Sequence, residues 1–150
     1  MREKLLVSAC LLGENCKYSG GNNYCPDVER LQERFEIVPV CPEQLGGLPT
    51  PRTPSERAGG RVLARDGRDV TEAFRRGAEK TLDIARAEGA VRAVFQVRSP
   101  SCGCGIIYDG TFSGALVPGM GVTAELLEKN GVRVYESTRI DALLDAEGAV

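Results

Sequence analysis

Six cysteines stand in a chain of 150 residues that contains no histidine. The absence of histidine excludes Ser-His-Asp and Cys-His nucleophilic centres, histidine metal ligands and an imidazole proton shuttle. Cys10, Cys41 and Cys102 each come shortly after a β-branched apolar run of the type that forms buried strands. Cys16 lies a few residues beyond the first of these runs. The chemistry open to this chain is therefore that of thiols and carboxylates.

The spacing of the cysteines excludes the commonest thiol sites. A structural zinc site carries paired Cys-x₂₋₄-Cys knuckles and a thioredoxin-type centre carries Cys-x-x-Cys, and neither pattern occurs here. Iron–sulfur clusters also take cysteine thiolates, and three cysteines on a four-iron cube leave one iron open to a substrate atom. A single buried cysteine is usually a small apolar residue, which is how we interpret Cys25. Three cysteines after three strands favour a shared site instead.

Polar residues beside these cysteines could act with them. Glu43 follows Cys41 by two residues, and a carboxylate at a desolvated metal site can act as a general base, although a solvated loop glutamate is commoner. Ser99 and Ser101 precede the third cysteine, where a hydroxyl can orient a substrate or water or satisfy a turn. Arg52 offers a guanidinium suited to phosphate or carboxylate, or to a surface ion pair.

The elements that must position these residues follow from the hydrophobic pattern. Four apolar runs predict buried strands at residues 5–7, 37–40, 90–95 and 132–135. Helical patterns lie between and after them, at residues 26–35, 70–88, 122–130 and 140–145. Alternating strands and helices predict βαβ crossovers and a parallel sheet between helix layers. The fold class is therefore α/β, a single-domain, three-layer Rossmann-like fold with a mainly parallel sheet over residues 1–150.

Parallel strands bring the cysteines together, because ligands of open α/β sheets bind where the carboxyl ends of the strands meet. Two segments fall outside the alternation. Residues 42–69 are rich in Pro, Gly and Arg and predict a long ordered loop, in which Glu56 and Arg57 are interpreted as surface residues. Residues 98–121 predict a hairpin around residues 106–112.

Composition narrows the possible partners and the compartment. The net charge of −2 argues against a duplex-DNA binder, and few aromatic residues argue against a stacking platform for single strands. No apolar stretch approaches the roughly 18 residues of a membrane span, and the first apolar run is too short for a signal peptide. We therefore expect a cytoplasmic protein, whose cysteines are ligands or reactive thiols rather than disulfides.

Taken together, the motifs resemble those of the thiouracil desulfidase family of small bacterial proteins. The resemblance covers nearly the whole chain. It rests on the segments Val7–Tyr18, Val40–Arg52, Asp69–Thr71, Arg98–Gly103, Ile107–Phe112 and Gly121–Ala124.

This resemblance implies an oxygen-sensitive [4Fe–4S] enzyme that removes sulfur from thiolated uracil compounds, including 4-thiouridine monophosphate. Sulfide is released and a carbonyl remains, so the reaction is a hydrolysis of a C–S bond without net electron transfer. The resemblance implies Cys10, Cys41 and Cys102 as cluster ligands, with Cys16 as the first alternative. The fourth iron is then open and takes the substrate sulfur. Cys104 stands where a small residue such as Ser is usual, so it is not counted as a ligand.

The same resemblance assigns the acid–base and substrate-binding residues. The catalytic carboxylate maps to Glu43, and the catalytic serine maps to Ser101 or Ser99. The family's usual Arg-Tyr-Asp-Gly is replaced here by Lys17-Tyr-Ser19-Gly. We expect Arg52, with Lys17 or Ser19, to hold the phosphate or ribose end of a nucleotide. The expected partner is thus a small thiolated nucleobase or nucleotide.

Two other classes of function stay open at this point. A non-catalytic iron–sulfur or metal-binding sensor would bind the same cluster with a fourth protein ligand such as Cys16. A nucleotide-binding Rossmann-like domain would carry its cysteines incidentally, but the Gly-x-Gly-x-x-Gly expected after its first strand is missing.

Overall fold

The computed structural model describes residues 2–148 and confirms the predicted α/β class. Four parallel strands form the central sheet in the order β2-β1-β5-β8. Their bounds are β1 Glu3–Ser8, β2 Phe35–Val40, β5 Arg92–Phe95 and β8 Arg133–Glu136. Each matches one of the four apolar runs in the sequence. The order places β1 in the middle, so the chain segments that follow β1, β2 and β5 leave the sheet next to one another.

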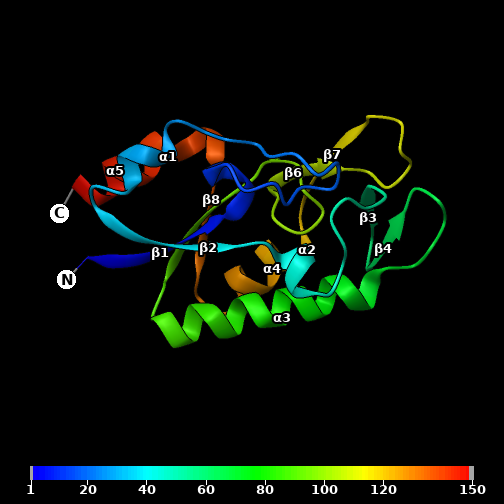
Figure 1. The fold of residues 1–150 in the computed structure, drawn as a ribbon, viewed down its shortest axis with the longest axis horizontal. Coiled ribbons are helices and arrows are strands. Elements are labelled where there is room, and N and C mark those ends of the chain that lie inside the picture. The colour runs from blue at the N-terminus through cyan, green and yellow to red at the C-terminus, as the bar shows by residue number, and fades with distance from the viewer. Residues whose placement is uncertain (1, 149–150) are drawn as a thin grey trace.

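Helices cover both faces of this sheet and make three layers (Figure 1). One layer holds α1 (Val28–Leu31) and α5 (Ile140–Gly148), and the other holds α3 (Thr71–Glu88) and α4 (Val122–Lys129). Strand β1 directs Leu5 and Val7 into the first layer and Leu6 into the second, as alternating strand side chains must. Within residues 2–148, no helix combines the length and the apolar character needed to cross a membrane.

The first predicted helix is shorter than its pattern indicates. The pattern extends it from Pro26 to Phe35, but α1 ends at Leu31 and Phe35 opens β2. The register of the sheet is the reason, because Phe35 pairs with Glu3 at the start of β1. The backbone of Phe35 forms strand pairs with β1, and this pairing takes precedence over the helical pattern of the sequence.

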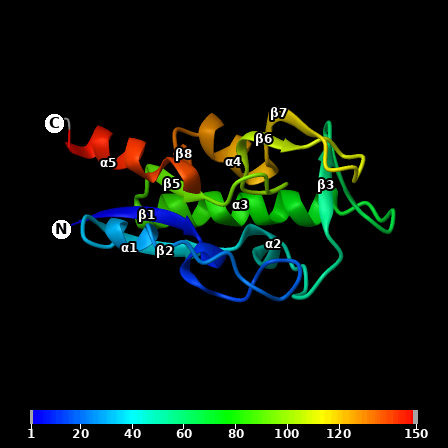
Figure 2. The ribbon, with the colours of Figure 1, turned by 90° about the horizontal axis from the view of Figure 1, so that it is seen from above.

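The prediction of one long loop over residues 42–69 is wrong. This segment contains the short helix α2 (Pro42–Leu45) and an antiparallel hairpin of β3 (Ser55–Ala58) and β4 (Arg61–Ala64). The hairpin predicted around residues 106–112 is confirmed by β6 (Cys104–Tyr108) and β7 (Leu116–Met120). Figure 2 shows both hairpins at the end of the molecule away from the two termini. They extend the fold beyond the carboxyl ends of the sheet strands.

Two glycines fix α2 against α3. A Cβ atom on Gly77 would lie 1.9 Å from the carbonyl oxygen of Pro42, and one on Gly46 would lie 2.0 Å from that of Ala73. Real atoms cannot approach so closely, so backbone packs directly on backbone here. Because α2 begins immediately after β2, this contact sets the position of the residues at the end of that strand.

Two short 3₁₀ turns complete the chain. The first, η1 (Ala9–Leu12), follows β1, and the second, η2 (Ser137–Arg139), joins β8 to α5. The first turn matters for the site because it places Cys10 directly beyond the end of β1.

Candidate active site

A cavity of about 520 Å³ lies where β1, β2 and β5 end. The segments that line it are η1 after β1, the start of α2 after β2, and the 96–102 loop after β5. The three strand-end cysteines therefore line one cavity, and a fourth cysteine lines it with them. The cysteines in the lining are Cys10, Cys16, Cys41 and Cys102.

The two remaining cysteines lie outside this lining. Cys25 packs against the core beside α1, and the Cys104 thiol is directed at the carbonyl oxygen of Val134, 3.5 Å away. All six cysteines are free thiols. The division between four cysteines at the cavity and two elsewhere follows the sequence-based choice of ligands.

Burial raises the pKa values of the cavity thiols of Cys10, Cys16 and Cys102. Burial raises the pKa of Cys16 to about 12, with the nearby Cys41 and Cys10 adding to the shift. Burial also raises the pKa of Cys10, and Cys41 contributes. The pKa of the buried Cys102 is raised for the same reason, although hydrogen bonds from Ser8 and Ser101 oppose the shift. The thiolate forms of these three cysteines are therefore disfavoured unless a cation neutralises them.

This donor set fits an iron–sulfur cluster. Several thiols without histidine form a soft ligand set of the kind that binds iron–sulfur clusters, and a bound metal centre deprotonates its cysteine ligands outright. Within residues 2–148, no three His, Cys, Asp or Glu side chains stand close enough to ligate one metal ion. Ligands of a four-iron cluster bind different irons, so such closeness is not required of them.

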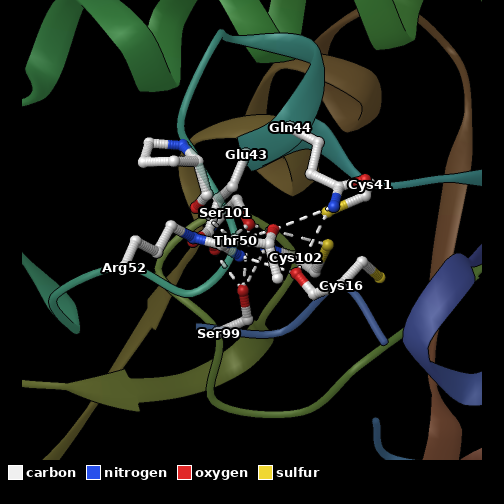
Figure 3. Close-up of polar contacts among 10 residues, drawn as sticks. Cys16, Cys41, Glu43, Gln44, Thr50, Arg52, Ser99, Ser101 and Cys102 are labelled. Atoms are coloured by element: carbon white, nitrogen blue, oxygen red, sulfur yellow. Dashed lines mark hydrogen bonds and ion pairs between the residues drawn. The ribbon is translucent and has the colours of Figure 1, made fainter. Parts of the chain in front are cut away.

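A continuous chain of polar contacts runs along the cavity wall (Figure 3). Arg52 donates from Nε to Glu43 Oε1 at 2.9 Å, and Ser101 donates from Oγ to Glu43 Oε2 at 2.9 Å. Ser99 Oγ lies 3.0 Å from Ser101 Oγ. The single hydroxyl proton of Ser101 is used toward Glu43, so Ser99 is the donor to Ser101. Between the two serines, Ser101 is the one that touches the carboxylate.

The side chain of Arg52 points into the protein rather than into open solvent. Only 7% of it is exposed, against 14% for Glu43. Besides Glu43, the guanidinium donates to the carbonyl oxygens of Pro49 and Cys16 and to the Thr50 hydroxyl, at 3.2, 3.0 and 2.9 Å. These bonds tie Glu43 to the loop that carries Cys16. This geometry supports a positioning role for Arg52 over the expected contact with a phosphate.

The loop of Ser99, Ser101 and Cys102 is held by its own turn and by α4. Ser99 Oγ accepts hydrogen bonds from the backbone N–H groups of Ser101 and Cys102, at 3.1 and 3.0 Å. In the first turn of α4, the N–H groups of Thr123 and Ala124 donate to the Ser101 carbonyl oxygen at 2.9 and 3.0 Å. A Cβ atom on Gly121 would lie 2.4 Å from the Ser101 carbonyl carbon. The helix start and this close approach fix the loop.

The two other residues expected to contact the substrate, Lys17 and Ser19, differ in position. Lys17 lines the cavity. Ser19 is exposed and lies outside the lining, so the structure does not bring it to the site.

Sequence reasoning missed several cavity residues. Glu56, interpreted from the sequence as a surface residue, is only 9% exposed and lines the cavity. Its Oε1 accepts hydrogen bonds from the N–H groups of Gly110 and Phe112, at 3.0 and 3.1 Å. Arg65 and Phe112 also line the cavity. The sequence gives no sign that Glu56 is buried, because the hydrophobic pattern does not predict the β3–β4 hairpin that carries it. Phe112, in contrast, belongs to one of the motifs on which the family resemblance rests.

The fold and site thus define an α/β protein with a thiol-lined cavity and a carboxylate–serine pair at its wall. The family model described as 2-thiouracil desulfurase matches residues 5–139, and this chain belongs to that family. The uncharacterized protein YbbK of Bacillus subtilis (strain 168) is 40% identical over 150 residues, covering 93% of this chain and 99% of the relative.

A solved structure agrees with this assignment. The chain is similar to the [4Fe-4S]-dependent thiouracil desulfidase TudS, with a TM-score of 0.91 and 40% sequence identity. The match covers 99% of this chain and 100% of TudS. The family resemblance inferred from the motifs is thereby confirmed.

Proposed function

We propose that this protein is a [4Fe–4S]-dependent desulfidase that hydrolyses the C–S bond of thiolated uracil compounds and releases hydrogen sulfide. The observation that carries the proposal is the meeting of four cysteines and the Ser101–Glu43 pair at one cavity. Its substrates are small thiolated nucleobases or nucleotides such as thiouracil and 4-thiouridine monophosphate. The reducing cytoplasm suits a site of free thiols.

Cys10, Cys41 and Cys102 are the proposed cluster ligands, because each follows a different strand and lines the cavity. Three protein ligands leave one iron of a cube open. When bound, the cluster would supply a soft Lewis acid for the thiocarbonyl sulfur. Asn23 donates to Cys10 Sγ at 3.5 Å, so the chain provides a hydrogen bond for this sulfur. Ser101 Oγ lies 3.7 Å from Cys102 Sγ, but its proton is directed to Glu43.

Glu43 is the proposed general base. Water attacks the ring carbon, one proton passes to the carboxylate, and the sulfur leaves as sulfide, so that C=S and H₂O become C=O and H₂S. Ser101 lies between Glu43 and Ser99 and can pass a proton along this chain, because a hydroxyl both donates and accepts. Arg52 keeps the carboxylate oriented while its own donors are engaged.

The test is purification without oxygen, followed by iron and sulfide quantitation and a sulfide-release assay with thiouracil. The expected result is a four-iron cluster and release of one sulfide for each uracil formed. Cys41→Ser should lower iron content, whereas Cys104→Ser should not, because its thiol is directed away from the cavity. Cluster-loaded protein that releases no sulfide from any thiolated uracil would contradict the proposal.

The position of Cys16 supports one second candidate, a sensor with four protein ligands and no open iron. Cys16 lines the same cavity, and the nearby Cys41 and Cys10 contribute to the raised pKa of its thiol. In that case Cys16→Ser would lower iron content as strongly as Cys41→Ser. A desulfidase with three ligands would instead retain its iron in Cys16→Ser.

A further inference from the structure

One cavity sulfur has a neutral hydrogen-bond donor that takes no part in the proposed proton transfer. Asn23 lines the cavity and donates from Nδ2 to Cys10 Sγ, 3.5 Å away. Burial raises the pKa of Cys10, and the Asn23 hydrogen bond opposes this shift because it favours the charged sulfur. A thiolate has no proton to donate and can only accept, so the contact suits a deprotonated Cys10 of the kind that ligates a metal centre.

Backbone hydrogen bonds fix the segment that carries Asn23 against the turn that carries Cys10. The N–H of Asn23 donates to the Cys10 carbonyl oxygen at 2.9 Å, and the N–H of Cys25 donates to the Leu11 carbonyl oxygen at 2.9 Å. These bonds hold the segment in place without any side chain. Within residues 2–148, the Asn23 side chain makes no hydrogen bond besides the one to the sulfur. The amide is therefore placed beside Cys10 by the backbone and acts on the sulfur alone.

The hydroxyl groups near Cys102 differ from Asn23 because each has a second duty. Ser101 directs its proton to the proposed general base. Ser8 is buried, and its Oγ accepts the backbone N–H of Gln96 at 2.9 Å. Removing either hydroxyl would leave another polar group without its partner, which is costly in the interior. Removing the Asn23 amide takes a hydrogen bond from the sulfur only, so its effect on the sulfur can be measured separately.

From these observations we propose that Asn23 is a positioning residue that tunes the iron–sulfur cluster through the sulfur of Cys10. The inference rests on the proposed function, in which Cys10 is a cluster ligand. Hydrogen bonds to ligand sulfurs are among the factors that set the reduction potential of a cluster.

The direction of the effect follows from charge. Asn23 withdraws electron density from the Cys10 sulfur, and a reduced cluster carries one more negative charge than an oxidised one. The hydrogen bond therefore stabilises the reduced form more and raises the reduction potential. The same withdrawal leaves the open iron a stronger Lewis acid for the thiocarbonyl sulfur. Loss of the Asn23 amide should thus lower the potential and weaken catalysis together.

Two other roles for Asn23 would have different consequences. If the side chain only supported its loop, its loss would lower Tm and iron content, but the clusters that remain would keep their potential. If the amide contacted the pyrimidine ring, its loss would raise KM for thiouracil and again leave the potential unchanged. The reduction potential is therefore the measurement that separates the three roles.

The test compares Asn23→Ala and Asn23→Asp with Asn15→Ala. Aspartate keeps the shape of asparagine but replaces the donor by a charged acceptor. Asn15 is an exposed residue of the same segment, lies outside the cavity lining, and has a side chain that bonds to Asn22. The proteins are purified without oxygen, and the potential of the loaded fraction is measured by a redox titration followed by EPR. Iron content, Tm and sulfide release from thiouracil are measured on the same samples.

We expect Asn23→Ala to lower the potential by up to 59 mV, which corresponds to a tenfold change in the ratio of reduced to oxidised cluster. Asn23→Asp should lower it further, because its carboxylate repels the added electron. The value of kcat/KM per cluster should fall about tenfold in Asn23→Ala, as is typical for residues that support metal ligands. Asn15→Ala should match the wild type in all of these quantities.

An unchanged or higher potential in the two Asn23 variants would overturn the inference, whatever happens to KM, Tm or iron content. The potential also separates this inference from the proposed function. If loaded wild-type protein releases no sulfide but Asn23→Ala lowers the potential, the desulfidase function fails and the role of Asn23 stands. Normal sulfide release with an unchanged potential in the variants gives the opposite result. Wild-type protein that assembles no cluster would refute both.

Discussion

Replacing Glu43 by glutamine tests the proposed general base with little change in shape. An amide oxygen can still accept from Arg52 Nε, which now donates to Oε1 at 2.9 Å. The amide nitrogen then faces Ser101 Oγ, which donates to Oε2 in the wild type and must instead accept. The hydroxyl proton of Ser101 turns to its other neighbours, such as Cys102 Sγ at 3.7 Å. The substitution therefore removes proton acceptance, reverses one hydrogen bond and leaves the buried Arg52 guanidinium without its carboxylate partner.

The two consequences of Glu43→Gln differ in size. Leaving the buried Arg52 guanidinium without its carboxylate costs about 3–5 kcal/mol, which lowers Tm by roughly 6–20 °C in a domain of this size. Loss of general base catalysis lowers kcat by at least ~10²-fold. We expect near-normal iron content in the folded protein, a lower Tm and strongly reduced sulfide release per cluster.

The assay measures iron, Tm and sulfide release on the same anaerobic sample, with Glu72→Gln as control. Glu72 is an exposed residue of α3 that pairs with Arg75, so its loss of charge should leave all three quantities unchanged. Near-wild-type turnover per cluster in Glu43→Gln would remove Glu43 from the mechanism. Loss of iron with normal turnover of the remaining loaded protein would make Glu43 a structural residue of the cluster site.

Three further substitutions test how the site is positioned. Arg52→Lys keeps the charge but cannot reach all four acceptors of the guanidinium, so kcat for thiouracil should fall about 10- to 100-fold with KM little changed; a change in KM alone would point to substrate binding. Gly77→Ala places a Cβ 1.9 Å from the Pro42 carbonyl oxygen and should lower both Tm and iron content, whereas Gly60→Ala, in open space, should change neither; equal melting curves would refute the packing argument. Cys102→Ser should lower iron content and Cys25→Ser should retain it, because only the former lines the cavity; iron loss in both would deny the assignment of ligands.

The sheet was predictable from the sequence because its strands are buried on both faces. Continuous β-branched runs predict such strands directly, and all four runs became strands of one parallel sheet. The positions of the cysteines were predictable for a related reason. Residues that directly follow parallel strands all lie at the carboxyl edge of the sheet. The β3–β4 hairpin is hard to predict because both strands have only four residues, Ser-Glu-Arg-Ala and Arg-Val-Leu-Ala, and the first of them is mostly polar. Their pairing is set by contacts with each other rather than by a hydrophobic period.

The role of Arg52 in the site could not be predicted from its residue type. A guanidinium on a proline-flanked loop can reach outward to a phosphate or inward to a carboxylate, and both outcomes satisfy the same local sequence. The choice depends on α2 and the Cys16 loop, which place Glu43 and a carbonyl oxygen within reach of one guanidinium. Once Arg52 is engaged inward, the cavity still has other cations in its lining. Arg65 and Arg98 line it because two separate segments, the chain just after β4 and the loop before Ser99, reach the same cavity.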